Sequence, residues 1–399
     1  MKDVNFLKKN QLMEVIEQTK TELIALSDYI YTHPEIGFQE VQAVQILTDY
    51  LAKQGFAVEK GYGGLPTAFR AVWKNGKGGP CIGLLCEYDA LLGMGHGCAH
   101  HLQGPSMIGA AMAIKEVVTG VPYTLEVIGT PGEECPNGGK TIMLENGAFR
   151  ELDVALMMHG GDTTTTDIKS MAASQFIVTY KGKSAHAAIA PDKGRSPLEA
   201  VMLAFNGLAF LRGHVVDDVR IHGIISDGGQ AVNVIPDTAT AKLEVRSYDR
   251  SYLDQVVKRV TRILDGAALM TDTTYAIEKI ATFYNKIPVL SLNQLLMENA
   301  ALAQTKMISP PREKTGSTDF ASVMYVVPGS CIRVAFIDKG TAAHSEEWLK
   351  QGLSDQAHDA MIMAAKVIGM TVWDLVAIPE CLVMVKDEFE KVKRESQKR

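Results

Sequence analysis

The chain has 399 residues, of which 46% are hydrophobic and 22% charged, an ordinary composition for a globular protein with room for two domains. Its formal net charge of −6 provides no basic surface, so we expect neither nucleic acid nor a membrane as a partner. No apolar run approaches the roughly 18 residues of a membrane span. The first residues, MKDVNFLKKNQ, lack the apolar core of a signal peptide.

The cysteines show no paired spacing and no CxxC motif. Without an export signal, such thiols are expected to be reduced, which predicts a cytoplasmic location. The six cysteines are Cys81, Cys86, Cys98, Cys135, Cys331 and Cys381.

The first 171 residues predict a regular alternation of helices and strands. A helical repeat of apolar residues runs through 11–32, and Pro34 in the segment HPEIGFQE ends it. We expect strands at 56–61, 67–73, 82–85, 123–128 and 154–158, and helices at 41–54, 104–118 and 138–146. This order favours a doubly wound α/β domain with a mixed, mostly parallel sheet.

The pattern changes near residue 172 and changes back near 285. Between these points we expect strands at 174–180, 219–225, 238–247 and 273–282, and helices at 196–211 and 252–268. The order βαββαβ is that of a ferredoxin-like unit. We therefore predict a catalytic domain formed by 1–171 and 285–399, with a second domain inserted at 172–284. The larger domain ends in a long helix at 356–375 and a charged, solvated helix end.

The stretch CEYDALLGMGHGCAHHLQG, residues 86–104, is rich in metal-ligating residue types. Carboxylate, thiolate and imidazole groups bind a borderline-soft divalent cation. Cys98 and His100 stand two residues apart, so one turn can direct both to the same point. Asp89 is either a further ligand or a group that orients a ligand histidine. The alternative is a polar loop with a structural thiol, because a local cluster supplies only two or three ligands.

Further ligand-type residues follow other predicted strands. Glu133 and Glu134 come after the strand at 123–128, and His159 comes after the strand at 154–158. In an open α/β sheet the carboxyl ends of the strands share one crevice, so these groups should converge with Cys98. His344 is a candidate last ligand.

The adjacent glutamates have separate expected roles. Glu134 is expected to bind metal, while Glu133 is the general acid/base that takes a proton from a water acidified by the metal and passes it to the leaving amine. The alternative is a helix N-terminus that favours acidic residues.

Three polar residues of the inserted domain are candidates for substrate contacts. His186 lies among small residues in GKSAHAAIAP, where a core histidine is not expected. Asn233 can hydrogen-bond a carbonyl, and Arg246 can fork onto a carboxylate. The alternative for Arg246 is an ordinary surface strand arginine.

Seven segments in order carry a resemblance to a known family. They are HPEIGFQE, EYDALLGMGHGCAHHLQG, GTPGEE, MMHG, GKSAHAAIAP, NVIPDTATAKLEVR and GSTDFASV. The chain resembles the zinc-type exopeptidases and amidohydrolases that include aminoacylase, carboxypeptidase G and the plant auxin-conjugate hydrolases. Within that family it is most similar to the branch that contains a subunit of p-aminobenzoyl-glutamate hydrolase and the β-alanyl dipeptidases.

The resemblance implies a zinc-exopeptidase-like catalytic domain with two divalent metal ions per chain, zinc or manganese. It implies that the inserted domain is a dimerisation and lid domain, and that His186 reaches the active site of the partner subunit to stabilise an oxyanion. It also implies the following sites: metal ligands Cys98, His100, Glu134, His159 and His344; catalytic residues Glu133, Asp89 and His186; and substrate-binding residues Asn233, Arg246, Gly316, Ser317 and Thr318.

The chain departs from the family pattern near the metal ligands. Ala99 replaces a glycine, and His101 stands where an amide or carboxylate is usual, so His101 is a candidate extra ligand or supporting donor. Cys135 follows the glutamate pair and is expected to reshape the pocket.

These observations predict a homodimeric metal-dependent amidohydrolase. Its expected substrate is an N-acyl amino acid, an aryl-amide conjugate similar to aminobenzoyl-glutamate, or a small dipeptide. Two alternatives stay open. One is a binding or regulatory subunit that has lost catalysis, and the other is a hydrolase of a C–N bond on an aromatic amine. The complete set of Glu133, Glu134 and His159 argues against the first.

Overall fold

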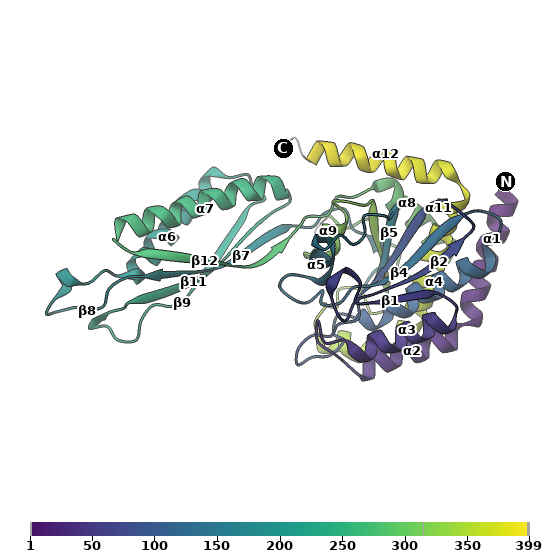
Figure 1. The fold of residues 1–399 in the computed structure, drawn as a ribbon, viewed down its shortest axis with the longest axis horizontal. Coiled ribbons are helices and arrows are strands. Elements are labelled where there is room, and N and C mark those ends of the chain that lie inside the picture. Colours follow the sequence, from purple (N-terminus) through teal and green to yellow (C-terminus); the bar gives the residue numbers. More distant parts are fainter. Residues whose placement is uncertain (1, 314, 397–399) are drawn as a thin grey trace. The chain divides into compact units, whose positions relative to one another are not determined.

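The computed structural model describes residues 2–313 and 315–396, which form two compact units (Figure 1). The first unit consists of the residues up to Lys169 together with Lys286–Glu395, and the second is formed by Ser170–Asn285. The second unit is thus inserted into the first, as the sequence predicted. Each unit has its own hydrophobic core.

A seven-stranded mixed sheet forms the centre of the first unit. β3 is parallel to β4 and β5, and β5 is parallel to β13, while β1, β2 and β6 pair antiparallel at the two edges. The strand order is β1 (Ala57–Lys60), β2 (Phe69–Asn75), β4 (Tyr123–Gly129), β3 (Cys81–Cys86), β5 (Val154–Gly161), β13 (Gly329–Ala335) and β6 (Thr165–Thr166). This confirms the predicted doubly wound fold with a mixed sheet.

Helices cover both faces of this sheet. Leu84 and Leu85 are neighbours on β3, yet they belong to different cores, because successive strand residues point to opposite faces. The larger core packs α1 (Lys2–Gln18), α2 (Lys20–Thr32), α3 (Val41–Lys53), α4 (Gln103–Val117), α8 (Leu290–Leu302) and α11 (Asp355–Ala377) against the sheet. The smaller core lies under α5 (Gly139–Glu145) and α9 (Phe320–Val323).

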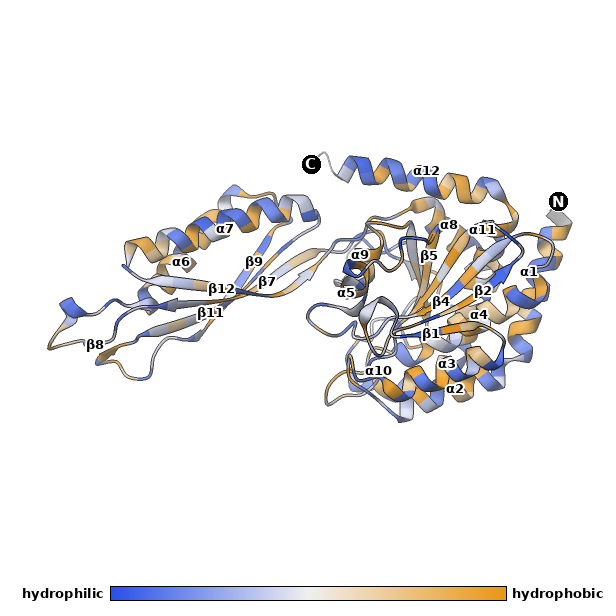
Figure 2. Cartoon of the chain, viewed as in Figure 1, coloured by the Kyte–Doolittle hydropathy of each residue, from blue (hydrophilic) through white to orange (hydrophobic). Residues whose placement is uncertain are grey.

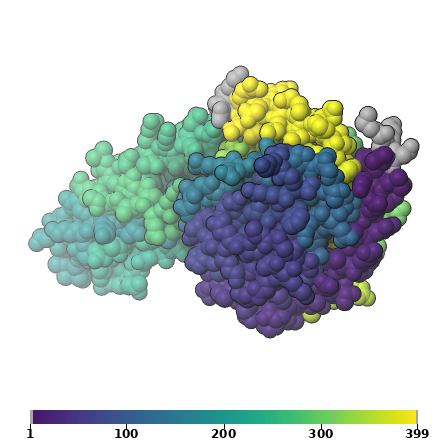
Figure 3. All heavy atoms as spheres, turned by 45° about the vertical axis from the view of Figure 1, so that its right-hand side comes forward, coloured from purple at the N-terminus to yellow at the C-terminus, as the bar shows by residue number. Residues whose placement is uncertain are grey.

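The predicted long helix at 356–375 is present as α11, whereas the tail that follows it differs from the expectation. α11 is long and apolar enough to span a membrane by length and composition alone, but 78% of its most apolar window is buried, as in a core helix. The charged tail is not merely a solvated helix end, because α12 (Pro379–Ser396) buries Val385 and Phe389 in the main core. Figure 2 shows its alternating hydrophilic and hydrophobic residues, and Figure 3 shows α12, in yellow, packed on the same unit as the N-terminal helices.

The second unit is a four-stranded antiparallel sheet with two helices. Its strand order is β12-β7-β11-β9, and its chain order β7-α6-β9-β11-α7-β12 is the predicted ferredoxin-like βαββαβ unit. The bounds are β7 (Ala172–Lys181), α6 (Pro197–Leu211), β9 (Arg220–Asp227), β11 (Thr238–Ser247), α7 (Arg250–Met270) and β12 (Thr274–Phe283). A small separate ladder pairs β8 (Ala185–His186) with β10 (Val234–Ile235).

The loops that follow β3 and β4 provide most of the ligand-type residues of the first unit. The loop after β4 folds back on itself so closely that a Cβ on Gly139 would lie 1.7 Å from the Pro131 carbonyl oxygen, which requires glycine there. The sequence predicted that His159 follows the end of this strand. In the structure β5 continues to Gly161, so His159 lies within the strand.

Candidate metal centre

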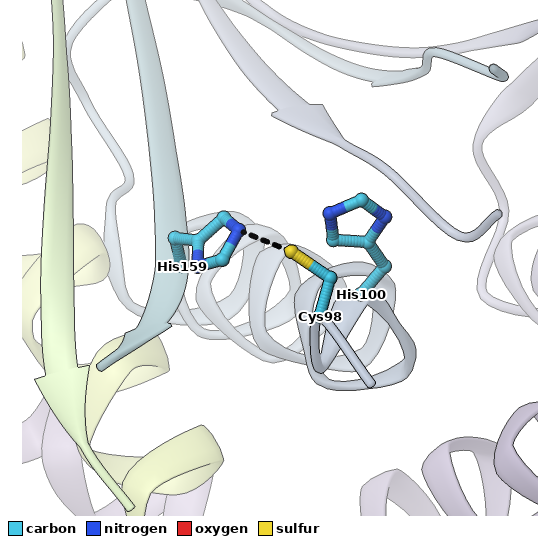
Figure 4. A group of neighbouring side chains, drawn as sticks. All are labelled: Cys98, His100 and His159. Atoms are coloured by element: carbon cyan, nitrogen blue, oxygen red, sulfur yellow. Dashed lines mark hydrogen bonds between the residues drawn. The ribbon is translucent and has the colours of Figure 1, made fainter. Parts of the chain in front are cut away.

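The thiol of Cys98 lies between the imidazoles of His100 and His159 (Figure 4). Cys98 Sγ is 3.5 Å from His159 Nε2, and one ligand-type atom of each residue lies within 4.8 Å of the others. Ligands about 2.0–2.3 Å from one tetrahedral ion are about 3.3–3.8 Å apart, so this spacing suits a metal. Ala99 has a left-handed φ of 60°, which makes the turn between Cys98 and His100.

A second group of ligand-type atoms shares the same thiol. His344 Nε2 is 3.4 Å from Cys98 Sγ and 3.4 Å from Glu134 Oε1. Cys98, Glu134 and His344 form one candidate group, and His100 forms another with Glu133 and Glu134. The structure therefore brings together all five residues expected to bind metal, in overlapping groups that share Cys98, His100 and Glu134.

Asp89 holds two of these residues in place from behind. Its carboxylate lies 3.0 Å from His100 Nδ1 and accepts a hydrogen bond from the Glu134 backbone N–H at 2.9 Å. Because Asp89 engages Nδ1, Nε2 is the ring nitrogen of His100 that is left to face the cluster. Of the two expected roles for Asp89, this geometry favours orientation of a ligand.

Two buried atoms of the cluster have no hydrogen-bond partner in the described part of the chain: His100 Nε2 and Glu134 Oε1. Such an atom costs about 1–3 kcal/mol unless something binds it. Burial opposes protonation of His100, yet the negative charges of Cys98, Glu87 and Asp89 raise its pKa well above the ordinary value. Because this field attracts positive charge and the donors are nitrogen, sulfur and oxygen, the residues fit divalent metal ions.

Glu133 lies in a buried group of carboxylates that one lysine partly neutralises. Ligand-type oxygens of Glu87, Glu133 and Asp319 lie within 4.8 Å of one another. The fully buried Lys140 donates to Glu87 at 2.5 Å and to Asp319 at 2.7 Å. Burial, together with the charges of Glu87 and Asp319, raises the pKa of Glu133 well above the ordinary value. A carboxyl group in this environment is suited to accept and hold a proton.

His101 points away from this cluster, which contradicts its candidacy as an extra ligand. Its Nε2 lies 3.0 Å from the carbonyl oxygen of Gly352, and its ring packs edge-on against Tyr31. Burial and the neighbouring His96 lower the pKa of His101 well below the ordinary value, so it is neutral. His101 is a core residue, and His96 is similar, with Nε2 3.1 Å from the carbonyl oxygen of Ile30.

A cavity of about 400 Å³ opens beside the cluster. Gly316, Ser317 and Thr318 line it, at the position expected for a substrate wall. Cys135 is not a lining residue, and its thiol lies so close to Gly37 that a Cβ there would be 2.4 Å away. The cavity also exposes residues that the sequence did not single out, namely Asp162, Lys286, Arg312, Arg333 and Trp348.

The three candidates of the inserted unit occupy two places within it. His186 on β8 is exposed and pairs in register with Val234, next to Asn233, whose carbonyl oxygen accepts from the Ala187 N–H at 3.0 Å. Arg246 on β11 donates to both carboxylate oxygens of Glu244, at 2.6 and 3.0 Å. The roles of His186, Asn233 and Arg246 in substrate binding stay predictions.

The segment HPEIGFQE supports the site from outside. The carbonyl oxygen of Glu35 accepts from the Ala90 N–H at 2.8 Å, next to Asp89. Glu40 is fully buried and accepts from the Gly132 N–H at 2.8 Å, in the loop that leads to Glu133. Sequence reasoning placed this segment in a turn and missed both contacts, because they join parts of the chain that lie far apart in sequence.

Comparisons with known proteins bear on the family and the fold of this chain. A model of the peptidase dimerisation domain matches residues 169–271, which cover most of the inserted unit. The chain is 33% identical to the Xaa-Arg dipeptidase of Homo sapiens, covering 98% of this chain and 94% of that protein. It is 29% identical to a subunit of the p-aminobenzoyl-glutamate hydrolase of Escherichia coli K12, covering 95% of this chain and 94% of that one.

Among solved structures, the fold is similar to that of a dinuclear metal-binding peptidase of the M20 family from Bacillus subtilis. The TM-score is 0.71 at 20% identity, over 90% of this chain and 99% of that one.

Proposed function

The chain belongs to the M20 peptidase family and is a hydrolase of C–N bonds, and on this premise we propose that it is a homodimeric amidohydrolase that uses two divalent metal ions. The proposed substrate is an N-acyl amino acid, an aminobenzoyl-glutamate-like conjugate or a small dipeptide. The observation that supports this most is the convergence of Cys98, His100, Glu134, His159 and His344 in one cluster, of which all but His100 line a cavity that also exposes Glu133.

Cys98, His100, Glu134, His159 and His344 would hold the ions, which when bound supply positive charge that acidifies a water molecule and polarises the amide carbonyl. Glu133 would take a proton from the attacking water and give it to the amide nitrogen as the C–N bond breaks. The raised pKa of Glu133 supports this role, because the carboxyl group must carry a proton between the two steps.

Other parts of the proposal follow from the family. His186 would act across the dimer on the developing oxyanion, and Asn233 would bind the substrate carbonyl. Zinc suits the cysteine and histidine ligands, and manganese is the second candidate. The cytoplasmic location expected from cysteine usage is also part of the proposal, and cell fractionation tests it.

The test joins metal analysis to a hydrolysis screen. The protein is loaded with zinc or manganese and offered N-acyl amino acids, aminobenzoyl-glutamate and β-alanyl dipeptides, while free amine release is followed. We expect two ions per chain and turnover of one substrate group. The variant Glu133→Gln should keep fold and metal but lose turnover, whereas Glu151→Gln, on the exposed surface, should behave as wild type.

Two outcomes would contradict the proposal. Turnover by Glu133→Gln would remove Glu133 as the acid/base. Absence of both metal and turnover in the wild type would favour a binding subunit.

A further inference from the structure

A group of three carboxylates adjoins the candidate metal centre and includes the candidate base. Ligand-type oxygens of Glu87, Glu133 and Asp319 lie within 4.8 Å of one another. Oxygens about 2.0–2.6 Å from a single divalent ion lie at most about 5 Å apart, so this spacing suits one ion with oxygen ligands. The group contains none of the five candidate metal ligands, but Glu87 Oε2 lies 3.4 Å from His100 Nε2. It is therefore a further place where carboxylates meet closely enough to share a cation.

The ammonium group of Lys140 lies among these carboxylates. Its Nζ donates to Glu87 at 2.5 Å and to Asp319 at 2.7 Å, and the side chains of these three residues are at most 2% exposed. Burial opposes the charge on Lys140, but the negative charges of Asp319 and Glu87 raise its pKa above the ordinary value, so Lys140 stays a cation. A lysine thus provides positive charge where a metal ion would provide it in a comparable group of carboxylates.

The surrounding backbone holds this arrangement in place. The Lys140 backbone N–H donates to the second oxygen of Asp319 at 2.9 Å, so Asp319 contacts both the backbone and the side chain of the lysine. A Cβ on Gly138, where φ is 49°, would lie 2.4 Å from Asp319 Cβ, so the close approach of Asp319 requires glycine there. On the other side, Gln103 donates to the second oxygen of Glu87 at 2.6 Å. The two carboxylates are therefore fixed around the ammonium group.

The kind of cation in this group decides what Glu133 can do. An ammonium group only donates hydrogen bonds, whereas a divalent ion binds carboxylate oxygens directly. Glu133 lines the cavity, where it can reach a water molecule or a substrate. A divalent ion shared by the three carboxylates would engage the oxygen of Glu133 that has to take up a proton. The lysine leaves that oxygen available.

We infer that Lys140 is a built-in cation that keeps a divalent metal ion out of the group formed by Glu87, Glu133 and Asp319, and that it thereby leaves Glu133 free for proton transfer. This inference rests on the proposed function, in which Glu133 carries the proton. Lys140 is a positioning residue, because it does not line the cavity and acts only through the carboxylates. Without its ammonium group, the buried negative charges would attract a divalent ion, and carboxylate oxygens suit Mn²⁺.

The test counts metal ions in a variant that lacks the ammonium group. Lys140→Ala and the wild type are dialysed against saturating Mn²⁺, and the ions per folded chain are measured. Lys140→Ala should bind one ion more than the wild type, and Mn²⁺ should raise its Tm by about 3 °C or more beyond the rise in the wild type. With Glu133→Gln added to Lys140→Ala, the Kd of the extra ion should increase about 10-fold or more, because one of its ligands loses its charge.

Lys9→Ala is the matched control for a hole left by a buried lysine. Lys9 Nζ lies 2.7 Å from Asp374 and 2.8 Å from the Asn299 side-chain oxygen, so its removal leaves one carboxylate instead of a group of three. Lys9→Ala should therefore bind as many Mn²⁺ ions as the wild type. In a wild type that turns over substrate, the activity of Lys140→Ala should fall over the Mn²⁺ range that fills the extra site.

Four results would overturn the inference: no extra ion in folded Lys140→Ala, an extra ion in Lys9→Ala as well, an unchanged Kd after addition of Glu133→Gln, or a Lys140→Ala chain that Mn²⁺ cannot restore to the folded state. The proposed function fails separately. If the wild type binds no metal and cleaves nothing, the proposed function is wrong, but an extra ion in Lys140→Ala alone would still show that Lys140 excludes it.

Discussion

Replacing Glu40 by glutamine should stabilise the protein at neutral pH, although Glu40 supports the loop that carries Glu133. Glu40 is fully buried, and its Oε1 accepts from the Gly132 N–H, while its Oε2 has no hydrogen-bond partner within the described chain. Burial, with a contribution from the charge of Asp89, raises the pKa of Glu40 from 4.5 to about 7. Glutamine keeps an acceptor for Gly132 and removes the buried charge.

The size of the effect follows from the difference in proton binding. Between pH 4.5 and about 7 the folded protein holds a proton on Glu40 that the unfolded chain has released, so the free energy of unfolding falls as the pH rises. One pKa unit corresponds to about 1.4 kcal/mol, so the loss is complete above pH 7 and reaches at most about 3.5 kcal/mol. Glu40→Gln does not titrate, and its advantage over the wild type should grow across this interval.

Urea unfolding of the metal-free proteins at a series of pH values from about 4.5 to 8.5 measures this difference. Glu59→Gln, at a side chain that is 60% exposed, is the control and should follow the wild-type curve. A difference between Glu40→Gln and the wild type that does not change with pH, or that favours the wild type more at high pH, would refute the reasoning.

Three more predictions concern the metal centre and its surroundings. Lys140→Met leaves two buried carboxylates unpaired and should lower the free energy of unfolding, measured by chemical denaturation, by about 3–5 kcal/mol. The control Lys350→Met removes an exposed ion pair and should lower the free energy of unfolding by less than about 0.5 kcal/mol. Asp89→Ala removes the group that orients His100 and should weaken metal affinity about 10- to 100-fold in a competition titration with a chelator; unchanged affinity would contradict that role. His101→Gln should keep the metal content per folded chain, whereas His100→Ala should reduce it, and loss of metal in His101→Gln would restore His101 as a ligand.

The convergence of the candidate metal ligands could be predicted from the sequence, because it depends on local features. Short apolar runs mark β3, β4 and β5, and parallel strands place the residues at their carboxyl ends in one crevice. The predicted ligands Cys98 and His159 therefore meet, although 61 residues separate them. The order of strands and helices in the inserted unit was equally local and was predicted for the same reason.

The residues that sequence reasoning missed depend on contacts between distant segments. Lys140 looked like an ordinary helix residue, and only the approach of Asp319, 179 positions away, shows that it neutralises the site. Arg312 and Arg333 carried no motif, and only the structure shows that both contact Asp167. The engagement of Arg246, in contrast, was open to prediction, since Glu244 lies two residues before it on the same strand face.

The placement of β13 limits how far the first unit can fold while the chain is still being translated. This strand, Gly329–Ala335, lies between β5 and β6 in the sheet, yet it is translated after the whole inserted unit. The inserted unit is contiguous and has its own core, so it can fold while the edge of β5 is still unpaired. Nascent chains that stop short of residue 329 should therefore expose an apolar strand edge to chaperones and proteases, and only chains extended past His344 can assemble the complete cluster around Cys98.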